Sequence, residues 1–235
     1  MSKYTDSQSN LDVSNPAPRC PVVLLLDTSG SMEGEPIDEL NLGVRQFLRE
    51  TSEDEAAGMS VELEIITFNS SVTRAVPFSP IAKIGRKIEP FEAYGMTNMG
   101  AALRMAAEDL KQRRSLYRRT GVSSYRPWVV LMTDGRPGDN WKAAAQELRE
   151  LGEKNRIQYI GIEIGNRADH GTLCQILPSQ PGPVRLQGLR FREFFKWLTD
   201  SLRSVSSSTP SQEAAGEVRL ADPSSWADLA SLTDL

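Results

Sequence analysis

Three separate segments of the sequence place oxygen-bearing side chains beside predicted strand or helix ends. Asp27, Ser29 and Ser31 follow one apolar run, Thr97 precedes a predicted helix, and Asp134 follows a second apolar run. Hard oxygen donors favour Mg²⁺, with Mn²⁺ or Ca²⁺ as alternatives, over zinc. Two carboxylates balance the charge of a divalent ion, and an acidic side chain from a partner protein would complete its coordination. The five residues therefore predict a metal site.

The elements that must position these residues alternate between strands and helices. Short apolar runs predict buried strands, and apolar residues at helical spacing predict amphipathic helices. A turn at 69–71 separates two of the strands, so the second is expected to return as an antiparallel partner. Strands are expected over 22–26, 61–68, 72–76, 128–132, 157–164 and 184–186; helices over 37–48, 99–110, 141–151, 168–177 and 191–205, with one or two helical turns in 81–88.

This alternation is typical of an α/β fold in which a doubly wound, mostly parallel sheet carries helices on both faces. About six strands are expected, with 72–76 as an antiparallel edge strand. In such sheets ligands bind at the carboxyl ends of the strands, where the strand order reverses. Asp27 and Asp134 both lie at such ends, so neighbouring strands would bring their carboxylates to one crevice.

The motif Asp-x-Ser-x-Ser, a distant Thr and a distant Asp-Gly resembles the metal-ion-dependent adhesion site of von Willebrand factor A (vWA) domains. The resemblance covers roughly residues 20–205 and implies a Rossmann-like fold. It implies that Ser29, Ser31 and Thr97 supply hydroxyl ligands. Asp27 and Asp134 would act directly or through water.

Longer segments narrow the resemblance to the bacterial TerY-like (tellurium-resistance-associated) vWA proteins. These segments are PVVLLLDTSGSMEGEPI, ITFNSSV, YGMTNMGAAL, RPWVVLMTDGRPGDNW and FFKWLTDS. The resemblance implies a role in tellurite or stress resistance, together with partner kinases and phosphatases. Residues beside the metal motif would form the rim that selects a partner: Glu33, Glu35, Met96, Asn98 and Arg136.

Composition changes divide the chain into a flexible leader (1–19), the vWA domain (20–205), and a Ser-rich linker with a C-terminal tail (206–235). The tail segment around Trp226 either docks on another protein or folds back on the edge of the sheet. The start of the sequence lacks a signal peptide, and no apolar run is long enough to span a membrane, so a cytoplasmic location without membrane contact is expected.

The net charge is −4 for 235 residues, which argues against nucleic acid as a partner. The basic stretch from Lys111 to Arg126 is therefore expected to be a solvated helix end. Cys20 and Cys174 are far apart, which argues against a disulfide framework or a zinc cluster.

The leading hypothesis is a non-enzymatic, Mg²⁺-dependent module that binds a protein through its Asp or Glu. Two alternatives stay open. A metal-dependent phosphoester hydrolase would need a general base, and His170 is the single histidine in the chain. A scaffold or phosphorylation target with a purely structural metal would be consistent with the Ser-rich tail.

Overall fold

The protein is described by a computed structural model that covers residues 10–84, 88–177 and 182–228. Its strands are β1 (Cys20–Asp27), β2 (Val61–Phe68), β3 (Val72–Pro80), β4 (Trp128–Thr133), β5 (Gln158–Glu163) and β6 (Val184–Arg185). Its helices are α1 (Glu35–Glu53), α2 (Glu55–Ser60), α3 (Met99–Thr120), α4 (Lys142–Asn155), α5 (His170–Ile176), α6 (Phe191–Ser206) and α7 (Pro210–Ala214).

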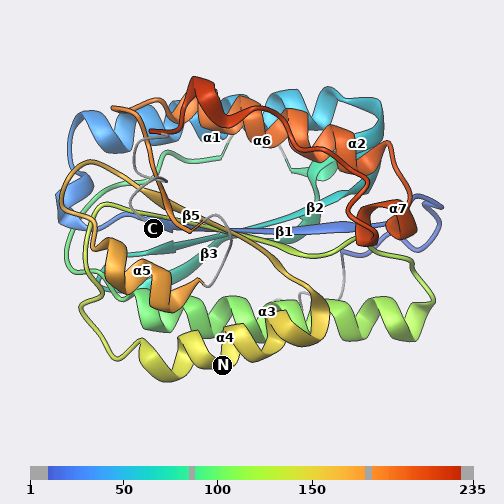
Figure 1. The fold of residues 1–235 in the computed structure, drawn as a ribbon, viewed down its shortest axis with the longest axis horizontal. Helices are drawn as coiled ribbons and strands as arrows, with labels where there is room; N and C mark the ends of the chain where they lie inside the picture. Colours follow the sequence, from blue (N-terminus) through green and yellow to red (C-terminus); the bar gives the residue numbers. More distant parts are fainter. Residues whose placement is uncertain (1–9, 85–87, 178–181, 229–235) are drawn as a thin grey trace.

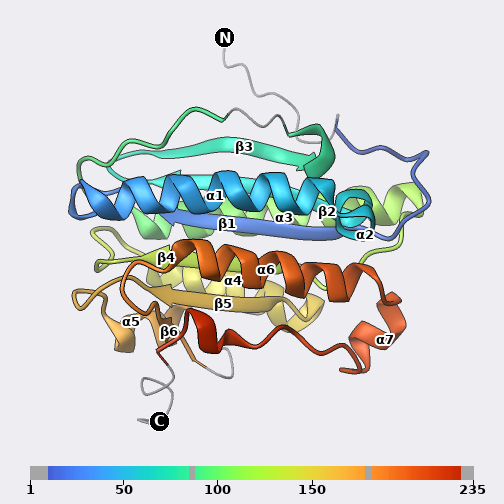
Figure 2. The same ribbon diagram turned by 90° about the horizontal axis from the view of Figure 1, so that it is seen from above.

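The six strands form one sheet in the order β3-β2-β1-β4-β5-β6 (Figures 1 and 2). Every neighbouring pair is parallel except β2 and β3, which are antiparallel. The expected mostly parallel sheet with one antiparallel edge strand is confirmed. Of the helical turns expected in 81–88, a single 3-10 turn, η2 (Ile81–Lys83), is present, and residues 85–87 lie outside the described part of the chain.

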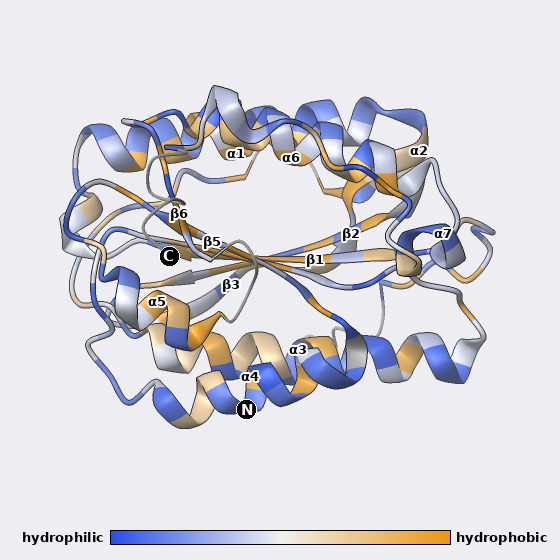
Figure 3. Cartoon of the chain, in the orientation of Figure 1, coloured by the Kyte–Doolittle hydropathy of each residue, from blue (hydrophilic) through white to orange (hydrophobic). Residues whose placement is uncertain are grey.

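Helices cover both faces of the sheet, with α1 and α6 on one side and α3 and α4 on the other (Figure 1). In β1, Val22, Leu24 and Leu26 face the α1–α6 side, whereas Val23 and Leu25 face the α3–α4 side. All five are fully buried. Figure 3 shows that the apolar residues of the helices lie mainly on the sides that face the sheet. A strand buried on both faces must be apolar at every position, which explains the unbroken apolar runs.

Two local residues and one distant side chain set the starts of the helices near the carboxyl ends of the strands. Pro36 lies in the first turn of α1, where a missing N–H costs no helical hydrogen bond. Gly34, which precedes this helix, has a φ of 88°, a value that favours glycine. At the N-terminus of α3, the side chain of Asp139 accepts hydrogen bonds from the N–H groups of Gly100 and Ala101, at 2.8 and 2.9 Å. These contacts fix the start of α3 beside the loop that follows β4.

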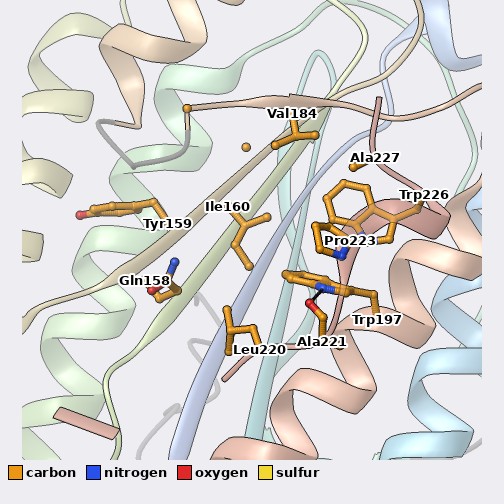
Figure 4. A pocket seen from close by; sticks show the side chains of 12 residues that line it. Gln158, Tyr159, Ile160, Val184, Trp197, Leu220, Ala221, Pro223, Trp226 and Ala227 are labelled. Carbon is orange, nitrogen blue, oxygen red and sulfur yellow. Dashed lines mark hydrogen bonds between the residues drawn. The ribbon is translucent and has the colours of Figure 1, made fainter. Parts of the chain in front are cut away.

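The C-terminal segment folds back on the sheet edge. Ala227 forms an antiparallel bridge with Leu186, and Trp226 is 2% exposed. Its ring packs against those of Phe194 and Trp197 on α6, with centroids 5.0 and 5.2 Å away. Between this segment, α6 and β5 lies an apolar cavity of about 210 Å³ (Figure 4). Of the two readings of the tail, the structure therefore shows the one in which it covers its own domain.

The basic stretch on α3 differs from the expected solvated helix end, and that prediction is wrong for Arg113. The Arg113 side chain is 1% exposed and pairs with Glu62 on β2 at 2.7 Å. Arg126, beyond the helix, pairs with Glu213 of α7. A buried charge has to be paired, and Glu62 supplies the opposite charge. Among the described helices, none has the length and apolar composition needed to cross a membrane.

Candidate metal centre

The candidate site lies where the strand order reverses, between β1 and β4. These two strands are parallel neighbours, with Leu26 of β1 opposite Met132 of β4. Asp27 is the last residue of β1, and Asp134 directly follows β4. The sheet therefore brings the two carboxylates to the same edge, as expected from the sequence.

Asp27 is fully buried and held by hydrogen bonds on both oxygens. Its Oδ1 accepts from the N–H of Ser29 at 2.8 Å, and its Oδ2 accepts from the hydroxyl of Thr133 at 2.5 Å. Burial raises the pKa of Asp27 to about 6, and the nearby Asp134 charge adds to this effect, while the bonds from Ser29 and Thr133 oppose it. A divalent cation would offset the cost of burying this charge.

The serine hydroxyls connect the first segment to the carboxylate after β4. The Ser29 and Ser31 hydroxyls lie 3.1 Å apart, and the Ser31 hydroxyl donates to Oδ1 of Asp134 at 2.6 Å. Asp134 is 6% exposed. The side chains of Ser29, Ser31 and Asp134 therefore form one continuous group, although Asp134 lies 103 residues beyond Ser31.

Thr97 approaches from the loop before α3. Its hydroxyl oxygen lies 3.7 Å from the point where a Cβ on Gly135 would be, next to Asp134. Its carbonyl accepts a hydrogen bond from the N–H of Gly138 at 2.7 Å. This loop also contacts the first segment, since the N–H of Gly30 donates to the Gly95 carbonyl at 3.0 Å. All five predicted metal-site residues thus lie at one edge of the sheet, at the end of β1, after β4 and in the loop before α3.

Gly95 sits at a close approach between loops. Its φ is 72°, and a Cβ there would lie 2.2 Å from the Ser70 hydroxyl oxygen. That hydroxyl accepts from the N–H of Met96 at 2.9 Å. Asn98 donates from its side chain to the Ser70 carbonyl at 2.8 Å. Asn98, predicted to be a rim residue, therefore ties the loop to the β2–β3 turn.

The other predicted rim residues lie on the surface around this edge. Met96 is 62% exposed, and Glu33 and Glu35 are exposed on the turn before α1 and at its start. Arg136 is 77% exposed, and its guanidinium pairs with Asp169 at 3.2 Å. Sequence reasoning missed Tyr94, which is 54% exposed beside Met96. An aromatic residue in a loop next to a metal motif is the signal that would have identified it.

The donor set fits a divalent cation. It consists of two carboxylates and three hydroxyls, and the nearest cation in sequence, Arg136, is paired with Asp169 instead. Among the described residues, no ion pair is formed by Asp27 or Asp134, so both buried carboxylates lack a cationic partner. Oxygen ligands of this kind suit Mg²⁺ and related ions. Within the described chain, no cluster of three or more His, Cys, Asp or Glu offers a competing metal site.

Curated relatives match the chain only in part. The inter-alpha-trypsin inhibitor heavy chain H3 of Mesocricetus auratus is 23% identical over 185 residues, which cover 71% of this chain and 20% of that protein. The chain thus spans about one fifth of the length of the curated relatives it matches.

Solved structures share the fold. The pilus adhesin SpaC from Lactobacillus rhamnosus GG matches with a TM-score of 0.64 and 15% identity, over 80% of this chain and 30% of that one. Proximal thread matrix protein 1 from the mussel byssus, with a zinc-occupied MIDAS motif, matches with a TM-score of 0.55 and 18% identity, over 78% of this chain and 48% of that one. A metal-ion-dependent adhesion site implies a divalent metal.

The family comparison covers the sheet and the candidate site together. The von Willebrand factor type A domain matches residues 22–189, a span that starts in β1 and ends just before α6. It contains all five residues of the predicted metal site. Because this match covers more than half of the chain, the protein belongs to the von Willebrand factor type A domain family.

Proposed function

We propose that the protein is a Mg²⁺-dependent protein-interaction module, non-enzymatic at its metal site. Ser29, Ser31 and Thr97 would hold the ion directly, with Asp27 and Asp134 behind them. The observation that carries the proposal is the contact of Ser31 with both Ser29 and Asp134, since it joins carboxylate and hydroxyl donors from two loops. Domains of this family commonly bind protein ligands through such a metal.

The partner supplies an Asp or Glu carboxylate to the metal. Two buried carboxylates neutralise the charge of a divalent ion, and the hydroxyls add none, so the ion keeps an electrophilic position toward solvent. The exposed surfaces of Tyr94 and Met96 give one side of the rim an apolar character. Arg136, on the other loop, contributes positive charge to the rim. An acidic residue with an apolar neighbour is the ligand type that this rim favours.

The cellular setting is proposed on the motif resemblance alone. The proposed setting is a tellurite or stress-resistance system of the TerY-like kind, in which the chain acts in the cytoplasm with partner kinase and phosphatase proteins. The structural neighbours include a pilus adhesin, so location needs its own test. Fractionation of the native host, probed with an antibody to this chain, would decide between the cytoplasm and the cell surface.

The experiment is a pull-down from native lysate with purified full-length chain. The wild type is used with Mg²⁺ and with EDTA, and Ser29→Ala/Ser31→Ala is used with Mg²⁺. Ser204→Ala/Ser207→Ala is the matched control, because both serines are exposed near the C-terminus of α6, away from the site. The proposal expects a partner retained by wild type and control in Mg²⁺ only. Equal retention in all lanes would favour a scaffold with a structural metal.

The hydrolase alternative gains no support from the position of its one candidate base. His170 has both ring nitrogens engaged, Nδ1 with Glu163 and Nε2 with Cys174. Neither contact is with a residue of the metal centre. Release of phosphate from a generic phosphoester, lost in Asp27→Ala, would be the result that revives this alternative.

A further inference from the structure

A cysteine, a histidine and a glutamate form a chain of contacts outside the metal centre. His170 and Cys174 lie on α5 four residues apart, so their side chains share one face of the helix. Nε2 of His170 lies 3.4 Å from Sγ of Cys174. Nδ1 of the same ring contacts Oε1 of Glu163, the last residue of β5. The order is therefore thiol, imidazole, carboxylate.

The carboxylate determines which ring nitrogen can act as a base. Glu163 is fully buried, and its second oxygen lies 3.4 Å from the guanidinium of Arg185. A carboxylate paired with a guanidinium accepts hydrogen bonds, so Nδ1 of His170 carries the ring proton and its N–H donates a hydrogen bond to Glu163. In the neutral ring, Nε2 then presents its lone pair to the thiol of Cys174. Glu163 is thus a positioning residue that fixes the tautomer.

The same geometry argues against a metal site at these residues. Glu163 and Cys174 lie at opposite nitrogens of the imidazole ring, so their donor atoms do not converge on one point. A single ion bound to one nitrogen would be out of reach of the ligand at the other. What remains is the arrangement of a nucleophile, a base and a residue that orients the base.

The thiol needs such a base. Burial, and then the Glu163 charge, raise the pKa of Cys174, so the resting side chain is a thiol rather than a thiolate. The thiolate is the reactive form of cysteine. Cys174 is itself half-buried, the His170 side chain is 36% exposed, and Gln175 next to the cysteine is exposed. A small electrophile can therefore reach the sulfur without a deep binding pocket.

We propose that Cys174, His170 and Glu163 form a reactive thiol site that is oxidised by hydroperoxides. His170 Nε2 takes the thiol proton while the sulfur attacks the distal oxygen of the hydroperoxide, and the O–O bond breaks. The sulfur becomes a sulfenic acid, losing two electrons, and the hydroperoxide gains them. The proton held by His170 goes to the departing oxygen, which leaves as an alcohol, or as water when hydrogen peroxide is the oxidant.

Hydrogen peroxide is the probe for the test, applied to the native full-length chain. Dimedone traps the sulfenic acid, and mass spectrometry of peptides reports the modified fraction of each cysteine. Cys20, the other cysteine, is fully buried and serves as an internal reference that reacts only after unfolding. The wild type should be labelled at Cys174 and not at Cys20. Labelling of neither cysteine would overturn the proposal.

Variants separate a chemical role of His170 from a structural one. A general base typically contributes 10²–10⁴-fold, so His170→Ala should slow labelling of Cys174 by at least about tenfold. Added imidazole should restore part of the rate, because the ring it replaces is partly exposed. Gln175→Ala, an exposed change next to Cys174, is the matched control and should react at the wild-type rate. Equal rates in wild type and His170→Ala would overturn the proposal.

The role of Glu163 has a spectroscopic test. His170 is the only histidine, so ¹⁵N-labelled histidine gives one pair of ring signals. The wild type should show the tautomer with the proton on Nδ1, and Glu163→Gln should shift the population toward Nε2. A wild-type ring that is neutral with its proton on Nε2 would contradict the proposed geometry, since the lone pair would then not face the thiol.

Discussion

Replacing Arg113 with methionine removes one half of a buried ion pair. The Arg113 and Glu62 side chains are each 1% exposed and lie 2.7 Å apart. The guanidinium also lies 5.5 Å from the ring centroid of Phe78. In Arg113→Met, the Glu62 carboxylate still has the Arg19 guanidinium at 3.6 Å. Breaking a buried pair costs about 3–5 kcal/mol, and we expect a loss in that range.

A double-mutant cycle shows whether the loss of stability comes from separating the Arg113 and Glu62 charges. Glu62→Leu alone removes the carboxylate that pairs with Arg113 at 2.7 Å and should cost a similar amount. Additive effects would then total roughly 6–10 kcal/mol. In the double variant neither charge remains. Arg19 keeps bonds to the carbonyls of Asp12 and Asn15, at 2.7 and 2.9 Å, whereas the Tyr117 hydroxyl loses its acceptor. That loss costs about 1–3 kcal/mol, so the double variant should be more stable than either single one.

The assay is urea unfolding followed by tryptophan fluorescence, with free energies extrapolated to water. Additive costs in the double variant would refute the reasoning, because they would mean that the two charges do not stabilise each other. Single-variant costs below about 1 kcal/mol would also refute it, since that is the range for exposed ion pairs.

Three further changes test other parts of the structure. Burial raises the pKa of the Glu64 carboxyl well above its ordinary 4.5, so the folded state binds the proton more tightly than the unfolded state does. Stability therefore falls as the pH rises from the ordinary pKa to the raised one. Glu64→Gln should therefore be more stable than wild type at about pH 8 and equal to it at about pH 4, as measured by urea unfolding. Gly95→Ala combines positive φ with a clash at 2.2 Å and should lower stability by more than Gly165→Ala, which has positive φ but open space. Trp226→Ala should cost up to about 3–5 kcal/mol in thermal or urea unfolding, and no change would mean that the tail does not stabilise the domain.

Much of the fold could be predicted because parallel strands buried on both faces are apolar at every position. β1 and β4 are such strands, and the residues directly after them carry the metal motif. Asp27 and Asp134 are brought to one edge because the parallel neighbours β1 and β4 end together. The antiparallel β3 was visible from the turn at 69–71, although it extends further, to Pro80, than expected.

Other features depend on contacts that have no local pattern. Glu62 and Glu64 alternate with apolar residues in β2, a pattern typical of a strand with one solvated face, yet both are buried. Arg113 lies on α3, 51 residues from Glu62, so its pairing could not be read from the charge run on α3. The His170–Cys174 spacing was visible in the sequence. The carboxylate that orients the ring comes from the end of β5, and only the folded chain brings it there.

The central claim is that the loops after β1 and β4 and before α3 bind one divalent cation. Calorimetric titration of metal-free, full-length chain with Mg²⁺, repeated with Mn²⁺, tests it directly. The account predicts one ion per chain for wild type and for Ser204→Ala/Ser207→Ala. It predicts no binding for Ser29→Ala/Ser31→Ala, with the fold retained by circular dichroism. Equal binding by all three proteins, or none by the wild type, would contradict it.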